Sequence, residues 1–258
     1  MKTIITIAIS CALIALYRPA ATAQAAAAEQ AELKWVVPAE KIPDVLKKLG
    51  LDENDAKEER VLFFDTEKIE LHDRPQQLIL RARQQTGEKI ESTIKWRMGS
   101  DLTQSATVLN GKLEIDWTCG RDPMLSWSED RDKLEGSTDE LKVASAEKLF
   151  EAEGQKAVIA AAKASIPWAK LRLYGPTTAY VWKKVKLPHY ESKVTVERWK
   201  LQDGTKHDDL LEISVKIPIT GDLKKDTQLF CDAAKNALGE PRPTSKTDVV
   251  LHFFQPGK

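Results

Sequence analysis

Hydrophobic and polar residues alternate in short runs along most of the chain. Alternation with a period of two predicts β-strands that bury only one face. Turn residues such as Asn110 and Gly111 separate neighbouring runs, which favours antiparallel pairing. We expect strands at residues 33–37, 61–64, 78–83, 89–98, 106–109, 112–118, 179–186, 193–201, 210–217 and 249–254.

Other segments carry hydrophobic residues at helical spacing. Residues 39–49 have this pattern and stop at Gly50, and residues 222–238 show it again near the C-terminus. Between them, a stretch rich in Ala, Lys and Glu follows a capping-box sequence at residues 137–140. We therefore expect an α+β fold in which a helical insertion at about 119–178 lies between two sheet-forming halves.

The N-terminus differs in kind from the rest of the chain. Lys2, the apolar run 4–16 and a stretch of small residues have the layout of a secretory signal. We expect residues 1–23 to form a signal peptide that is cleaved near Ala23. The mature protein, residues 24–258, is then a single domain that is periplasmic or secreted, with no membrane partner, because no later segment is long and apolar enough to span a bilayer.

The cysteines allow two interpretations. Cys119 and Cys231 remain after signal removal, and in an oxidising compartment they are candidates for one disulfide. The alternative is a pair of buried free thiols, and the sequence leaves both open. Residues 8–11 loosely resemble a lipid-attachment motif ending at Cys11, but the apolar stretch before it is very short, which favours ordinary cleavage.

Composition and charge narrow the class of partner. The chain has 258 residues, 42% hydrophobic and 30% charged, which is typical of a globular protein that buries a full core without a cofactor. Lys and Arg together number 39, and so do Asp and Glu. This balance gives no bulk-charge argument for a nucleic-acid partner. Any anion-binding site requires basic residues that are gathered locally.

Basic residues do gather on strand faces. The period of two places Arg81 and Arg83 on one face of their strand, and Lys95 and Arg97 on one face of the next. Such faces are most often the solvated outside of a half-buried sheet. The second interpretation is an anion site, because adjacent guanidinium groups repel one another unless an anion lies between them.

The first half of the chain resembles a known family. Its motifs are Phe64-Asp65-Thr66, Leu71, Leu80-Arg81-Ala82-Arg83 and Thr93-Ile94-Lys95. Their order and spacing are similar to the succession F-D-T, L, L-R-x-R and T-x-K of the CYTH proteins, also called triphosphate tunnel metalloenzymes.

Weaker matches extend the resemblance to residues 30–118 and 179–250. A family strand with the pattern E-x-E-x-K is similar to residues 30–34, where Gln30 replaces the first acid. Later basic and acidic strand residues of the family are similar to Lys184-Val185-Lys186, Glu197 and Glu212-Ile213-Ser214, where Ser214 replaces a second acid. The closing lysine segment of the family resembles Ser245-Lys246-Thr247.

The resemblance implies a fold and a binding mode. CYTH proteins form an antiparallel β-barrel or tunnel of about eight strands with flanking helices, and inward Arg and Lys side chains bind a triphosphate. The substrate-binding residues it implies here are Lys34, Arg81, Arg83, Lys95, Lys184, Lys186 and Lys246. The catalytic residues it implies are Glu32, Lys34 and Lys95.

The resemblance also implies a divalent cation. Glutamates of the family hold Mg²⁺ or Mn²⁺, hard cations that prefer oxygen ligands and polarise a phosphoryl group. The metal ligands it implies here are Glu32, Glu114, Glu197 and Glu212.

Two functions follow from these expectations. The first is an exported, metal-dependent phosphohydrolase that acts on an inorganic or organic triphosphate; an exported enzyme lacks a steady ATP supply, which argues against cyclisation of ATP. The second is a non-catalytic CYTH-like protein that binds phosphate or polyanions or is purely structural. Gln30 and Ser214 favour the second, because each replaces a carboxylate and carboxylate count largely decides affinity for hard cations.

Overall fold

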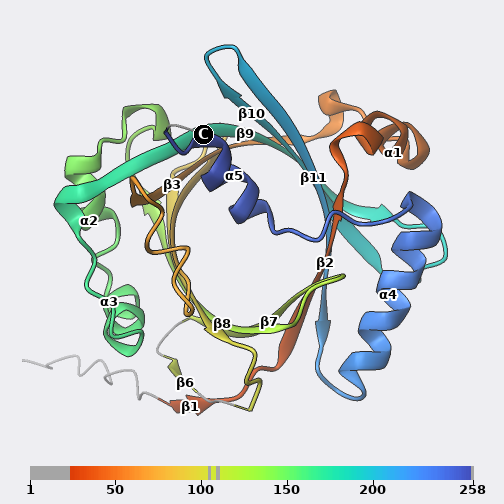
Figure 1. The fold of residues 1–258 in the computed structure, drawn as a ribbon, viewed down its shortest axis with the longest axis horizontal. Helices are drawn as coiled ribbons and strands as arrows, with labels where there is room; N and C mark the ends of the chain where they lie inside the picture. Colours follow the sequence, from red (N-terminus) through yellow and green to blue (C-terminus); the bar gives the residue numbers. More distant parts are fainter. Residues whose placement is uncertain (1–23, 104–105, 109–110, 257–258) are drawn as a thin grey trace, which may run out of the picture.

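Nine strands form a closed barrel (Figure 1). The computed structural model describes residues 24–103, 106–108 and 111–256, so the expected signal peptide at residues 1–23 lies outside the described residues. Around the barrel, the strand order is β10, β11, β2, β7, β8, β5, β4, β3 and β9, and β9 pairs with β10 to close the ring.

The barrel confirms the expected fold class with two differences. It has nine strands in the described residues rather than about eight, and β2 and β7 pair in parallel while the other neighbours are antiparallel. The barrel strands are β2 (Gln30–Val37), β3 (Lys57–Thr66), β4 (Leu78–Gln85), β5 (Ile90–Gly99), β7 (Lys112–Thr118), β8 (Met124–Leu134), β9 (Leu171–Lys186), β10 (Lys193–Asp203) and β11 (Lys206–Pro218). Two short strands, β1 (Gln24–Ala26) and β6 (Ala106–Val108), pair outside the barrel.

In the described residues, four helices lie outside the ring and one lies within it (Figure 1). The outer helices are α1 (Ile42–Leu49), α2 (Ala146–Leu149), α3 (Glu153–Ala161) and α4 (Leu223–Leu238), and the inner helix is α5 (Lys246–Phe254). Short 3₁₀ turns lie at Ala39–Lys41, Glu53–Asp55, Thr138–Glu140, Val143–Ser145 and Trp168–Lys170. No helix in the described part of the chain is both long and apolar enough to cross a membrane.

The strand faces divide as the alternation predicts. Leu78, Leu80 and Ala82 are buried in an outer core between the barrel and the helices around it. The other face of the same strand carries Arg81 and Arg83, which line the barrel interior. The basic faces are therefore not a solvated outer surface, because closure of the sheet turns them inward.

The last segment is a helix, and the strand expected at residues 249–254 is wrong. Ser245 caps α5 by accepting a hydrogen bond from the Asp248 backbone N–H, and Asp248 accepts one in return from the Ser245 N–H. The apolar residues of α5 pack all around it against inward barrel residues such as Phe63. No residue of α5 is fully exposed, so the helix lacks the polar face of a surface helix, and Val249-Val250-Leu251 resembles a buried strand in sequence.

The segment 119–178 is only partly helical, which corrects the expected helical insertion. It contains the barrel strand β8 and the first half of β9, whereas α2 and α3 together cover a small part of it. Strand β8 has an irregular register against β5, with shifts at both ends. These interruptions, together with its charged residues, hide the alternation that would have identified it.

A disulfide joins Cys119 and Cys231, as the sequence allowed. Their Cα atoms are 5.9 Å apart, within the usual range for such bonds. Cys119 directly follows β7, and Cys231 lies in α4, which packs on β2. The bond therefore fastens α4 to the outside of the barrel.

Candidate functional site

The barrel encloses a cavity of about 250 Å³. Inward positions along the strands are apolar next to α5 and charged beyond it; on β11, for example, Leu210 packs with α5 and Glu212 lines the cavity. Eight Lys or Arg side chains and five Glu or Asp side chains line the cavity, so its walls carry an excess of positive charge. The basic residues are Lys34, Arg81, Arg83, Lys95, Arg97, Lys112, Lys216 and Lys246.

A hairpin places the central basic residues. Strands β4 and β5 pair so that Arg81 lies opposite Thr93 and Ile79 lies opposite Lys95. Because residues two apart on a strand share a face, Arg81, Arg83 and Lys95 all point into the cavity. The structure thus brings together the three residues of the L-R-x-R and T-x-K motifs.

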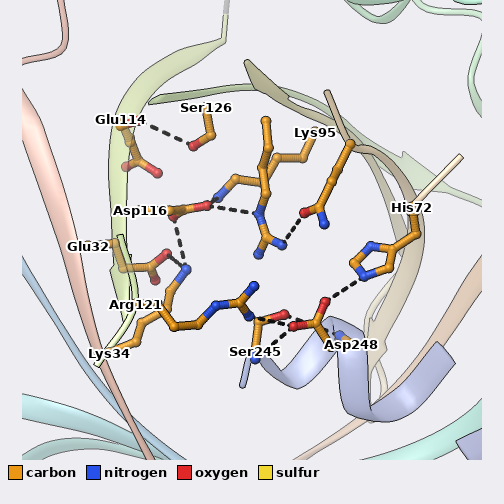
Figure 2. A network of polar contacts seen from close by, with 12 residues as sticks. Glu32, Lys34, His72, Lys95, Glu114, Asp116, Arg121, Ser126, Ser245 and Asp248 are labelled. Atoms are coloured by element: carbon orange, nitrogen blue, oxygen red, sulfur yellow. Dashed lines mark hydrogen bonds and ion pairs between the residues drawn. The ribbon is translucent and has the colours of Figure 1, made fainter. Parts of the chain in front are cut away.

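Asp116 on β7 holds three of the cations (Figure 2). Its carboxylate lies 2.9 Å from Lys34 Nζ, 2.8 Å from Lys95 Nζ and 3.5 Å from Arg97 Nε. Burial works to raise the pKa of Asp116, but the three cations outweigh burial and hold the pKa well below its usual range. One buried carboxylate therefore keeps a basic cluster in place.

Lys34 on β2 is shared between two acids. Its Nζ atom lies 2.8 Å from Glu32, in addition to the contact with Asp116. Glu32 and Asp116 are register partners on the parallel strands β2 and β7. Burial opposes the charge on Glu32, but Lys34 and Lys95 lower the pKa of that carboxyl to about 2.

Lys246 at the start of α5 is held in the same way. Its Nζ atom lies 2.6 Å from Glu197 and 2.9 Å from Glu212, which face each other across β10 and β11. Burial works against the charge on Lys246, but the two carboxylates outweigh it and raise the pKa of the ammonium group. Neither oxygen of Glu212 accepts a well-oriented hydrogen bond, and burial raises the pKa of this acid.

Burial weakens the charged forms of two of the cavity cations, Arg81 and Lys95. Arg81 donates one hydrogen bond to the Thr93 hydroxyl, at 3.1 Å, and its nearest acid, Glu91, is 3.8 Å away. Its buried Nε has no hydrogen-bond partner. Burial and the neighbouring Arg83 lower the pKa of Arg81, and burial lowers the pKa of Lys95. The space between these side chains is therefore favourable for an anion.

A second network anchors α5 (Figure 2). Asp248 in the first turn of α5 lies 2.6 Å from His72 Nε2 and 2.5 Å from Arg121 Nη1. His72 is itself placed by Asp65 of the F-D-T motif, whose carboxylate accepts backbone N–H bonds from Thr66, Leu71 and His72. This motif thus has a structural role, since it builds the turn that holds α5.

The four expected metal ligands all line the cavity, but their arrangement does not fit a divalent cation. Glu32 contacts Lys34, Glu197 and Glu212 contact Lys246, and Glu114 lies 2.5 Å from Lys216. In the part of the chain that the structure describes, no group of three or more His, Cys, Asp and Glu side chains is placed to hold a metal ion. Each of these four carboxylates instead forms an ion pair with a lysine ammonium group.

Lys184 and Lys186 lie outside the cavity, contrary to the prediction. Both are exposed near the end of β9. Two residues, Lys183 and Lys184, face the single residue Thr195 of β10, and Lys184 has a φ of 62°. This bulge interrupts the alternation on which the prediction depended. Lys183 lines a second pocket that shares Arg83 with the main cavity.

Several cavity residues were absent from the expected set. Arg97 lies two residues after Lys95, and Lys216 lies two after Ser214; Asp116, two after Glu114, contacts Lys34 and Lys95 in the cavity wall. All three follow the period of two along strands already identified, so a strict extension of the pattern would have found them. Ser245 and Thr247 line the cavity from α5, which no strand pattern indicates.

Comparisons with solved structures support the fold. A candidate adenylate cyclase from Bacillus halodurans is 17% identical, with a TM-score of 0.53, covering 85% of this chain and 95% of that chain. A candidate adenylyl cyclase from Hippeastrum, described as having a dominant triphosphatase activity, is 14% identical, with a TM-score of 0.48 and coverage of 87% and 95%. No protein-family profile and no curated protein matches the sequence. The likeness to the Bacillus structure confirms a CYTH-like fold and shows nothing beyond the fold.

Proposed function

We propose that this CYTH-like barrel binds a short linear polyphosphate, either inorganic or attached to an organic group. The observation that carries the proposal is Arg81, whose buried Nε lacks a partner while its guanidinium faces a cavity with excess positive charge. An arginine in this position favours phosphate, because its planar fork matches two phosphate oxygens at once.

The arrangement of the basic residues also suits an extended anion. Side chains two apart on a strand are separated by about 7 Å along it. Arg81 and Arg83 on β4, with Lys95 and Arg97 on β5, therefore form two short rows along the cavity wall. A chain of linked phosphates can contact several of these groups together, whereas a single phosphate contacts fewer.

Tripolyphosphate is expected to raise the melting temperature of the protein, because it binds the folded state only. Arg81→Ala should weaken its binding about 10-fold to 100-fold, since a charge-assisted hydrogen bond contributes about 1.5 to 3 kcal/mol. Isothermal titration calorimetry measures the change, and Arg81→Lys should restore only part of the affinity.

Arg172→Ala is the matched control, because Arg172 pairs with Glu67 at the surface and both side chains are more than half exposed. It should leave tripolyphosphate binding unchanged. If wild-type protein shows neither a thermal shift nor heat of binding, the proposal is wrong.

Metal-dependent hydrolysis of the bound anion is the second candidate function. The five acidic side chains that line the cavity are the observation in its favour, because carboxylate oxygens are the ligands that Mg²⁺ and Mn²⁺ prefer. Phosphate release from tripolyphosphate with Mg²⁺ or Mn²⁺, lost in Glu212→Gln, would support it. Absence of release with either metal would leave binding as the function.

We also propose that the protein is exported. The N-terminal residues support this proposal by their signal-like sequence, and the Cys119–Cys231 bond supports it because disulfides persist mainly in oxidising compartments. N-terminal sequencing of the protein from its native cells should find a start near Gln24. Recovery of Met1 in the membrane fraction would contradict export.

A further inference from the structure

Two pairs of acids in the cavity each hold a lysine of the same chain. Glu32 and Asp116 are opposite one another on β2 and β7, and the ammonium of Lys34 lies within 2.9 Å of both. The second pair, Glu197 and Glu212, is opposite across β10 and β11, with Lys246 within 2.9 Å of both. Acids directly opposite on neighbouring strands repel one another, so each pair requires a cation between its members.

We infer that Lys34 and Lys246 are built-in cations that take the places of divalent metal ions, so that the cavity binds polyphosphate without a metal. This inference rests on the proposed anion-binding function and specifies how that function is achieved. A lysine ammonium has three N–H donors. Each of these two lysines donates a hydrogen bond to one acid and forms an ion pair with a second, so it has N–H groups left for a phosphate oxygen.

The position of Lys246 makes its replacement by a metal ion unfavourable. It is the first residue of α5, whose apolar residues pack in one buried cluster with inward residues of the barrel strands. Asp248, two residues further on, is fixed by His72 and Arg121. Because the buried helix keeps the Lys246 backbone in place, a metal ion could displace this ammonium only if the side chain swung away from both acids.

Lys34 has an equally closed environment. It is 6% exposed, and its register partner on β11 is Ser214, a hydroxyl rather than a third acid. Gln30, two residues before Glu32, is exposed at the start of β2. The two acids in contact with Lys34 are therefore balanced by Lys34 and its basic neighbours, and neither Gln30 nor Ser214 adds a carboxylate to them.

The first test uses wild-type protein. Two samples of wild-type protein are compared by calorimetry. One is treated with chelator, and the other is dialysed overnight against Mn²⁺, after which the free ion is removed. Their affinities for tripolyphosphate should agree within about twofold. Mn²⁺ titrated alone and followed by electron paramagnetic resonance should show no protein-bound ion. A loss of affinity of about tenfold or more on chelation, or a bound Mn²⁺ in wild type, would overturn the inference.

The second test removes one built-in cation. Lys246→Met keeps the length of the side chain and leaves Glu197 and Glu212 without their ammonium. This variant should gain a Mn²⁺ site that wild type lacks, and its tripolyphosphate affinity should become dependent on Mn²⁺. Lys235→Met is the matched control, because Lys235 of α4 pairs with Glu240, just beyond the helix, and both side chains are more than half exposed; it should gain no site.

The outcomes separate this inference from the proposed function. If wild type binds no tripolyphosphate under any condition, the proposed function fails, and Mn²⁺ binding by wild type and Lys246→Met still decides whether lysine holds the cation position. A folded Lys246→Met that gains no Mn²⁺ site contradicts the inference. If that variant does not fold, the chelation and Mn²⁺ measurements on wild type decide the question alone.

Discussion

Loss of the Cys119–Cys231 disulfide is expected to lower the free energy of unfolding by about 4 to 5 kcal/mol, because the bond closes a loop of 112 residues in the unfolded chain. Urea titrations of wild type with and without reductant, and of the double variant Cys119→Ser with Cys231→Ser, measure the difference. The outer core around α4 should become less stable, since this helix then depends on packing alone.

Thiol titration of the unfolded, unreduced protein provides the control. The bond predicts no free thiol from this pair, and two titrated thiols would contradict it. Tripolyphosphate affinity should change little in the double variant, because neither cysteine lines the cavity.

Asp116→Asn is expected to cost about 3 to 5 kcal/mol, because removal of one partner leaves buried charges without compensation. Asp116 is 6% exposed and contacts Lys34, Lys95 and Arg97. Urea titration measures the loss. Asp139→Asn is the matched control, since Asp139 pairs with Arg60 at the surface, where an ion pair contributes about 0 to 1 kcal/mol.

The sign of the pH dependence follows from the lowered pKa of Asp116. A carboxyl whose pKa is lower in the folded than in the unfolded state stabilises the fold above about pH 4, its unfolded pKa, and loses this contribution as the pH falls further. Asp116→Asn should remove that part of the acid dependence. Tripolyphosphate should stabilise the variant more than wild type, because the anion supplies the missing negative charge. Equal stabilisation would indicate that the anion binds elsewhere.

Local patterns predicted most of the barrel but not its closure. The alternation in β4 and β5 identified both strands and the residues that share a face. Whether the Arg81 face lies inside or outside depends on pairings between distant strands, which no local window contains. The resemblance to CYTH proteins supplied that information, because its motifs imply a closed tunnel.

The candidate site was predictable where strands are regular. Lys34, Arg81, Arg83 and Lys95 lie in the cavity as expected, and Arg97 follows the same period. The bulge at Lys183 and Lys184 interrupts the period of two along β9. The prediction that Lys184 and Lys186 point into the cavity was therefore wrong. The pairing of Lys246 with two acids depends on where α5 packs, and this is a tertiary property that residue spacing does not report.

The place of β2 in the barrel bears on how the protein folds. This strand begins near the N-terminus, yet it pairs with β11, so that Lys34 lies opposite Ser214, about 180 residues away in sequence. Pairing over such separations slows folding, because the loop-closure entropy is lost before the contacts form. The ring can close only after the last strand is available, so the two clusters of acids and lysines form late. Until then these charged side chains remain hydrated, so the desolvation cost of the cavity falls on the last step of barrel formation.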